Sequence, residues 1–199
     1  MYHVITKRGW IRDAVNKITT SITCVISNLL LPPIAAYVAW KYVGEHGVNA
    51  TTNNGQFISP ARPLQYDVLG EKAEPLKGRW TYVVLAPKGC EKQCQDQLYL
   101  TRQLRIAINK DFERVRRVVF EPSGTLSDDL KAEHQDLLTL GALPEAYQAA
   151  FQGDKFNHAG EQIFLIDPLG NLMMYYDLSV NFRGMLKDLQ KLLKISQVG

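Results

Sequence analysis

Two cysteines four residues apart stand between an apolar run and a stretch with the periodicity of a helix. Cys90 and Cys94 follow the segment Trp-Thr-Tyr-Val-Val-Leu at residues 80–85, after the short connection Ala-Pro-Lys-Gly. The N-terminus of a helix carries partial positive charge and unpaired N–H groups, which stabilise a thiolate and lower the pKa of a thiol. Cysteines at i and i+4 of a first helical turn also face the same side. The pair can therefore close a disulfide or bind a soft metal ion.

The size and charge of the chain exclude two classes of protein. Its 199 residues suffice for one domain with a sizeable core and an appendage. The formal net charge is only +3, and nucleic-acid binding would need a clustered basic face, so we expect no nucleic-acid partner. There are three cysteines, Cys24, Cys90 and Cys94, which is not the disulfide framework of a small secreted protein.

An apolar segment near the N-terminus predicts a membrane anchor. Residues 18–43 hold no charged side chain before Lys41, and a helix needs roughly 20 residues to cross a bilayer. The preceding residues 1–17 are mostly basic in charge, which places the N-terminus in the cytoplasm and the bulk of the chain outside. A cleaved signal peptide and a buried pair of short helices around residues 32–33 are the alternatives.

The residues after the predicted anchor divide into a linker and a folded domain. Residues 44–62 are polar and rich in Asn, Thr and Gly, which is typical of a linker. The folded domain is therefore expected at 63–199, with a first strand at 64–69. If the anchor is real, the two cysteines of the domain face an oxidising compartment, where free thiols persist only when they are reduced again or bound to metal.

The order of predicted elements indicates the fold class. Apolar runs predict strands at 80–85, 115–120, 162–166 and 171–176, and periodicity predicts helices at 91–110, 128–140, 144–151 and 182–195. The last two strands flank the turn Asp-Pro-Leu-Gly and form a hairpin. The order β-α-β-α-β-β-α is that of an α/β, thioredoxin-like fold, with right-handed crossovers between its first strands.

A third ligand would turn the cysteine pair into a metal site. His158 lies in the sequence Asn-His-Ala-Gly directly before the third predicted strand, and in a thioredoxin-like fold that loop lies beside the cysteines. It is our candidate, although a loop histidine can also be merely solvated. We interpret His134 as a solvated residue on a polar helix face and the basic run 114–117 as a solvated edge. A structural disulfide or two unrelated thiols remain alternatives for Cys90 and Cys94.

Several segments resemble the Sco (SenC) family, in particular its membrane-anchored relatives from proteobacteria that are associated with cytochrome c oxidase genes. They are Gly-Arg-Trp-Thr-Tyr-Val-Val at 78–84, the Cys-x-x-x-Cys motif, Leu-Tyr-Leu-Thr-Arg at 98–102 and Ile-Phe-Leu-Ile-Asp-Pro-Leu-Gly-Asn-Leu-Met-Met at 163–174. The resemblance spans about residues 57–195. The family usually has proline after each cysteine, where this chain has Glu91 and Gln95, and its histidine usually lies about one residue nearer the following strand.

The resemblance implies a function. By it, Cys90, Cys94 and His158 would bind one copper ion, and the protein would help to assemble the copper-bearing subunit of cytochrome c oxidase, alone or with other assembly factors. It would be a single-pass protein of the inner membrane with a periplasmic C-terminal domain. If it is an enzyme, it is a thiol–disulfide oxidoreductase with Cys90 and Cys94 as catalytic residues.

Two other functions are weighed against this one. The first is a thioredoxin-like assembly scaffold that binds no metal and whose disulfide is permanent. The second is a peroxiredoxin-like peroxidase, which requires a threonine and an arginine beside the reactive cysteine. Thr101 and Arg102 lie too far along the predicted helix for that role.

Overall fold

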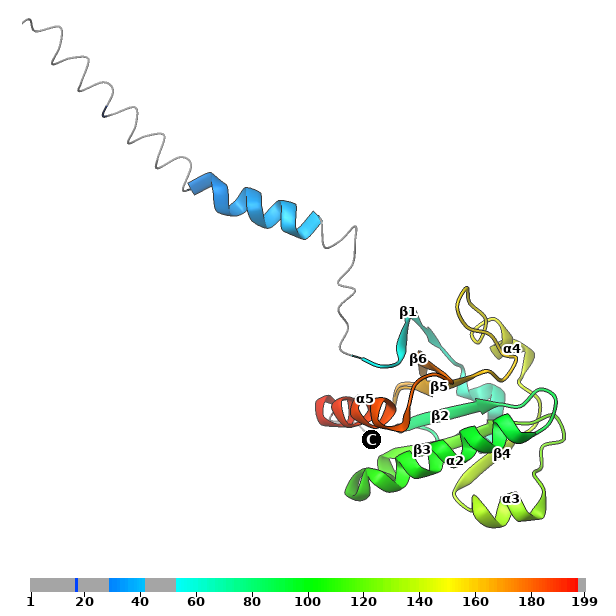
Figure 1. Ribbon diagram of the computed structural model, residues 1–199. Coiled ribbons are helices and arrows are strands. Elements are labelled where there is room, and N and C mark those ends of the chain that lie inside the picture. Colours follow the sequence, from blue (N-terminus) through cyan, green and yellow to red (C-terminus); the bar gives the residue numbers. More distant parts are fainter. Residues whose placement is uncertain (1–16, 18–28, 42–52, 197–199) are drawn as a thin grey trace, which may run out of the picture. The chain divides into compact units, whose positions relative to one another are not determined.

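The computed structural model describes residues 17, 29–41 and 53–196, in two compact units, Met1–Thr52 and Asn53–Gly199 (Figure 1). In the first unit, residues 29–41 form a helix whose side chains are all exposed. None of the helices in these described ranges is long and apolar enough to cross a membrane. Much of the predicted anchor, 18–28 and 42–43, lies outside the described residues, so the anchor stays a prediction.

The second unit is built on a six-stranded sheet with the order β1-β6-β5-β2-β3-β4. Its strands are β1 (Gln56–Pro63), β2 (Trp80–Leu85), β3 (Val115–Phe120), β4 (Leu137–Leu140), β5 (Gln162–Ile166) and β6 (Asn171–Asp177). The central strand β2 pairs in parallel with β3 and antiparallel with β5. Strand β4 extends the parallel part, and the β5–β6 hairpin with β1 forms the antiparallel part.

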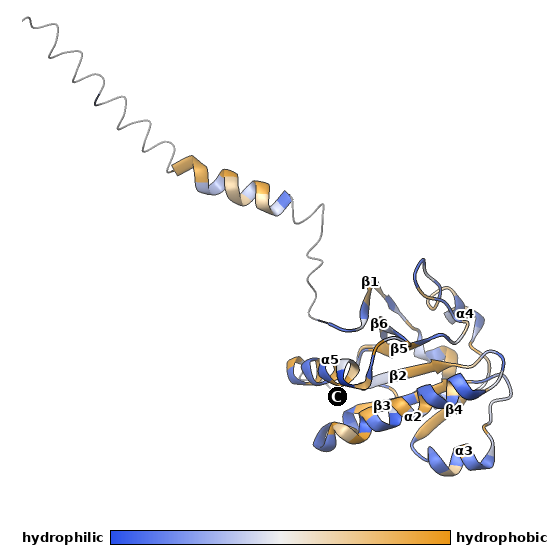
Figure 2. Cartoon of the chain, viewed as in Figure 1, coloured by the Kyte–Doolittle hydropathy of each residue, from blue (hydrophilic) through white to orange (hydrophobic). Residues whose placement is uncertain are grey.

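Helices and 3-10 turns cover both faces of this sheet (Figure 1). They are η1 (Tyr66–Ala73), α2 (Lys92–Ala107), η2 (Asn109–Arg114), α3 (Asp128–Glu133), α4 (Glu145–Gln148) and α5 (Phe182–Ile195). Successive residues of a strand point to opposite faces. On β2, Tyr82 therefore packs with side chains of α2 and α5, whereas Val83 packs with Tyr147 of α4 and its neighbours. Every residue of β2 is buried, and the second half of this strand is hydrophobic in Figure 2.

The predicted α/β, thioredoxin-like arrangement is confirmed in its centre. The strands predicted at 80–85, 115–120, 162–166 and 171–176 form, and so do the helices expected at 91–110 and 182–195 and the short helix expected at 144–151. The order of the first crossovers, β2-α2-β3, is also as predicted, and β2 and β3 are parallel.

Three predicted elements are wrong. Strand β1 occupies 56–63, so the linker does not extend to residue 62, and the first compact contacts of the domain begin at Asn53. No strand forms at 64–69, and Tyr66 begins the 3-10 turn η1. The helix expected at 128–140 ends at Glu133, because residues 137–140 pair with β3 as strand β4. In the first and third cases, pairing with a neighbouring strand overrides the local pattern.

Candidate functional site

Cys90 and Cys94 form a disulfide at the N-terminal end of α2. Their Cα atoms are 5.0 Å apart, within the usual range for a disulfide. Cys94 lies in the first turn of α2 and is only 6% exposed, whereas Cys90, just before the helix, is half-buried. Of the two cysteines, Cys90 is therefore the more exposed to solvent.

The turn that carries the disulfide is fixed by backbone hydrogen bonds. Ala86 N donates to Phe120 O of β3 at 2.9 Å, and Gly89 N donates back to Ala86 O at 3.0 Å. Gly89 has φ +96°, which L side chains rarely adopt, so glycine is needed to close this turn. Glu91 then stands at the N-terminal boundary of α2, and its carbonyl accepts from Gln95 N at 3.0 Å. The cysteines are thus held where the partial positive charge of the helix would stabilise a thiolate.

The loop that carries His158 lies beside this turn, as predicted. Two amides of α2 donate to one carbonyl of the loop: Gln93 Nε2 to Gly160 O at 2.8 Å and Gln97 Nε2 to the same oxygen at 3.0 Å. Gly160 and Ala159 line a small hollow together with Cys94. A Cβ atom on Gly160 would meet Leu85 O at 2.6 Å, so this close approach of loop and strand requires glycine.

His158 itself is exposed and faces a different hollow. That hollow, of about 240 Å³, is lined by His158 with Pro87, Phe120 and Pro122 among others, and Cys94 is not part of its lining. Within residues 29–41 and 53–196, no three His, Cys, Asp or Glu side chains are grouped so that they could hold a metal ion. The predicted ligands Cys90, Cys94 and His158 are therefore not assembled while the disulfide is closed.

Sequence reasoning missed Gln93 and Gln97, which attach the histidine loop to α2. Their i, i+4 spacing on the helix that begins with the cysteines is a signal that could have identified them, because residues so spaced share a face. Gln97 is only 1% exposed, which is uncommon for glutamine and points to a committed hydrogen bond.

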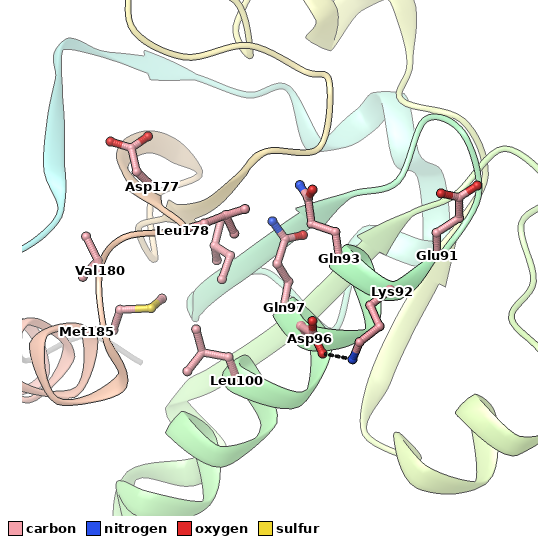
Figure 3. A pocket seen from close by; sticks show the side chains of 11 residues that line it. Glu91, Lys92, Gln93, Asp96, Gln97, Leu100, Asp177, Leu178, Val180 and Met185 are labelled. Carbon is pink, nitrogen blue, oxygen red and sulfur yellow. Dashed lines mark hydrogen bonds and ion pairs between the residues drawn. The ribbon is translucent and has the colours of Figure 1, made fainter.

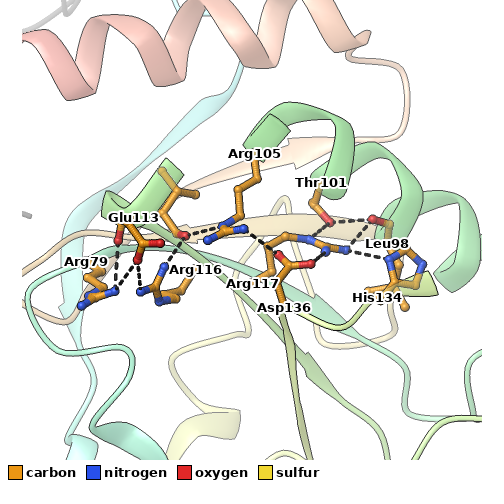
Figure 4. A network of polar contacts seen from close by, with 10 residues as sticks. Arg79, Leu98, Thr101, Arg105, Glu113, Arg116, Arg117, His134 and Asp136 are labelled. Carbon is orange, nitrogen blue, oxygen red and sulfur yellow. Dashed lines mark hydrogen bonds and ion pairs between the residues drawn. The ribbon is translucent and has the colours of Figure 1, made fainter. Parts of the chain in front are cut away.

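The predictions for His134 and for part of the basic run are wrong. Arg117 is 1% exposed and donates to Leu98 O at 2.7 Å, to Thr101 Oγ1 at 3.2 Å and to Asp136 Oδ1 at 3.0 Å (Figure 4). Its Nη2 also lies 3.3 Å from Nδ1 of His134, which is buried. Burial lowers the pKa of Arg117, and burial together with the charge of Arg117 lowers the pKa of His134. This network joins α2 to β3 and the start of β4.

A groove of about 550 Å³ runs along the other side of α2 (Figure 3). The residues Gln93, Gln97 and Leu100 of α2 face Leu178 and Met185 across it. Its lining residues are Glu91, Lys92, Gln93, Asp96, Gln97, Leu100, Ile163, Asp177, Leu178, Val180 and Met185. Glu91 and Gln93 also line the hollow that contains Cys94, so the groove begins at the disulfide turn.

Several solved structures are similar to this chain at low sequence identity. Copper-bound yeast Sco1 is 13% identical with a TM-score of 0.47, over 73% of this chain and 95% of that chain. Copper-bound Arabidopsis thaliana ScoI is 18% identical with a TM-score of 0.46, over 61% of this chain and 88% of that chain. BsSco is 15% identical with a TM-score of 0.43, over 61% of this chain and 84% of that chain. It is described as a member of the Sco family of cytochrome c oxidase assembly proteins, in which a disulfide switch was identified.

No curated protein matches the chain, but one family model matches most of its folded domain. The model of the "transmembrane-like, thioredoxin-like, C-terminal domain" matches residues 80–196, which include the disulfide, the histidine loop and all strands except β1. The chain belongs to this family of thioredoxin-like domains.

Proposed function

We propose that this protein exchanges thiols and disulfides through Cys90 and Cys94 and handles copper during assembly of the copper-bearing subunit of cytochrome c oxidase. The observation that carries the proposal is the disulfide itself, which closes at the start of α2 beside an open hollow. The class of partner follows from the Sco-like motifs of the sequence, and yeast Sco1 and the plant protein ScoI were both solved with copper bound.

The redox step balances between one dithiol and one disulfide. The Cys90 thiolate attacks a sulfur of the partner disulfide, a mixed disulfide forms, and the other partner sulfur leaves as a thiolate. Cys94 then attacks Cys90 Sγ, which releases the second partner thiolate and closes the Cys90–Cys94 disulfide. The partner gains two electrons and Cys90–Cys94 loses two. Half-buried Cys90 suits the attacking role and buried Cys94 the resolving one.

Copper in this proposal is cargo, which the protein binds only after its disulfide has been reduced. Two thiolates on one helical turn are donors that soft copper ions prefer. His158 is the proposed third donor, because its loop adjoins the hollow of Cys94 through Ala159 and Gly160. Reduction of the disulfide and a shift of the histidine side chain would both precede formation of the complete site.

We further propose that residues 18–43 anchor the chain in the inner membrane, with the N-terminus in the cytoplasm and the domain in the periplasm. The apolar run and the basic residues before it support this. Alkaline phosphatase fused after residue 199 should be active, whereas the same fusion without residues 18–43 should be inactive. The reverse pattern would refute this topology.

The experiment that tests the function is an anaerobic copper titration of the reduced full chain. We expect a one-to-one complex with a sulfur-to-copper charge-transfer band, which His158→Ala weakens and Cys90→Ser removes. The variant Cys90→Ser should also fail to support oxidase assembly in cells, and full assembly in that variant would refute the proposal. His134→Ala is a matched control, since His134 lies in the Arg117 network and should not change the band.

One observation favours a second candidate, a scaffold with a permanent disulfide: the disulfide is closed, and Cys94 within it is only 6% exposed. The reduction potential of Cys90–Cys94 separates the two. A potential near that of the compartment supports exchange, whereas one far below it, together with no copper complex, supports the scaffold.

A further inference from the structure

We propose that the groove between α2 and residues 177–185, named here the α2 groove, binds a segment of the redox partner in which an apolar side chain is followed by lysine or arginine. The inference rests on the proposed function, since the partner is the protein whose thiols exchange with Cys90–Cys94. The proposed function does not say how that partner is recognised, and the α2 groove supplies a binding site for it.

The inner surface of the α2 groove is apolar. Leu100, Ile163, Val180 and Met185 contribute to it, and Leu178 at its edge is 54% exposed. An exposed apolar surface that is rimmed by polar residues is typical of a binding site, because leaving it in water is unfavourable. The volume of about 550 Å³ can receive an apolar side chain with its neighbours.

The rim of the groove is acidic. Of its three carboxylates, Asp96 pairs with Lys92 at 3.1 Å. Within the described ranges, the carboxylate of Asp177 accepts hydrogen bonds from the neutral amides of Gln56 and Gln162, at 3.2 and 3.4 Å. Among the described residues, neither Asp177 nor Glu91 forms an ion pair, so two negative charges stay uncompensated at the rim. A partner segment with positive charge would complement them.

A buried amide supports the same occupant. Gln97 lines the groove, and its Nε2 is committed to Gly160 O. Its Oε1 is buried and has no hydrogen-bond partner within the described part of the chain. Unpaired buried acceptors are rare in folded proteins, because each costs free energy. An N–H group of a bound peptide would supply the missing donor after a small rotation of this amide.

The position of the groove connects binding to exchange. Glu91 and Gln93 line both the α2 groove and the hollow that contains Cys94. A segment bound in the groove therefore continues toward the disulfide, and a cysteine close to it in sequence would be held near the sulfur atoms. Such positioning raises the rate of a reaction between two groups without changing their chemistry.

The test measures binding of cysteine-free peptides to the full chain in detergent by fluorescence anisotropy. The probes are Gly-Gly-Leu-Arg-Lys-Gly with a C-terminal fluorescein, its Glu-Glu analogue in place of Arg-Lys, and its Ser analogue in place of Leu. We expect the basic apolar peptide to bind at least about fivefold more tightly than either analogue, with a smaller advantage over the acidic peptide at high salt. Leu178→Ser should weaken its binding about five- to tenfold, as expected for the loss of one half-buried apolar side chain.

Leu169→Ser is the matched control, because Leu169 is 80% exposed and lies in the β5–β6 turn outside the groove. Equal affinities for the three peptides, or equal effects of Leu178→Ser and Leu169→Ser, would overturn the proposal. A concentration-dependent dimer that Leu178→Ser dissociates, with no peptide binding, would overturn it in favour of a second copy of this chain as the occupant. The double variant Cys90→Ser/Cys94→Ser should still bind the peptide, so failure of the redox function leaves this result unaffected.

Discussion

The first turns of α2, around Cys94, and the later turns, around Thr101, both carry polar groups but differ in what those groups contact. In the first turns, the disulfide and the amides of Gln93 and Gln97 border two openings to solvent, the α2 groove and the hollow of Cys94. In the later turns, Thr101 and the carbonyl of Leu98 bind a buried guanidinium. One helix thus has an accessible end and an enclosed end.

The difference shows why polar residue types alone do not identify a functional site. Arg117, His134 and Asp136 are residue types that also occur in functional sites, but here their hydrogen-bonding groups are directed at one another (Figure 4). A buried polar network whose members are paired stabilises one arrangement of the core.

The largest effect is expected at the enclosed end. Arg117→Leu should lower the free energy of unfolding by about 3–5 kcal/mol, because the buried acceptors Leu98 O and Thr101 Oγ1 lose their charged donor. Chemical denaturation measures the change. The control is Arg116→Leu, whose ion pair with largely exposed Glu113 should contribute less than about 1 kcal/mol. Similar losses in both variants would show that the Arg117 network contributes no more to stability than a surface ion pair.

The contact between β2 and the histidine loop should come next. Gly160→Ala should cost about 3 kcal/mol, because it combines a φ of +92° with a clash against Leu85 O. Gly78→Ala is the control, since Gly78 has a φ of +72° but nothing within 4 Å of an added Cβ, and it should cost only about 1 kcal/mol. If the two variants unfold at the same denaturant concentration, the close approach of loop and strand does not contribute.

Reduction of the disulfide should have a smaller effect on stability. Cys90 and Cys94 are separated by 4 positions, and closing so short a loop contributes about 2 kcal/mol or less. Urea unfolding of the oxidised and reduced protein measures this. The double variant Cys90→Ser/Cys94→Ser must show no dependence on reductant. A loss larger than that of Arg117→Leu would reverse the comparison between the two ends of α2.

The smallest effect is a dependence of stability on pH through His134. Its pKa in the folded protein is lowered by burial and by Arg117, so the unfolded chain binds more protons once the pH approaches the ordinary histidine pKa. The stabilisation is therefore present above about pH 6.5 and is lost as the pH falls from there toward the lower folded pKa. His134→Gln should reduce this loss between pH 7 and pH 5 in urea titrations. An unchanged slope would mean that His134 does not titrate differently on folding.

The parts of the fold that the sequence could predict are those with strong local signals. The apolar runs of β2, β3 and β5 and the periodicity of α2 and α5 suffice to locate them. Strands β1 and β4 could not be found in this way. Only one residue of β1, Ile58, is buried, and β4 has four residues, so both depend on pairing with β6 and β3.

The site was predictable to a similar degree. The position of the cysteines and of the loop at 157–160 follows from the order of elements, but the side-chain direction of His158 does not. Arg117 offered a signal that we did not use, because it alternates with Val115 and Val119, and residues two apart on a strand share a face. The burial of His134 depends on the turn after α3, which has no local signature.

The edges of the sheet bear on aggregation. An exposed edge strand offers unpaired backbone groups to other chains. Here β4 is only four residues long, and β1 contains Pro60 and Pro63, which have no N–H to donate, and an irregular register between Phe57 and Arg62. Neither edge can extend a sheet into another molecule over more than a few residues. Association by shared β-structure is thus discouraged, and a partner must be recognised through side chains.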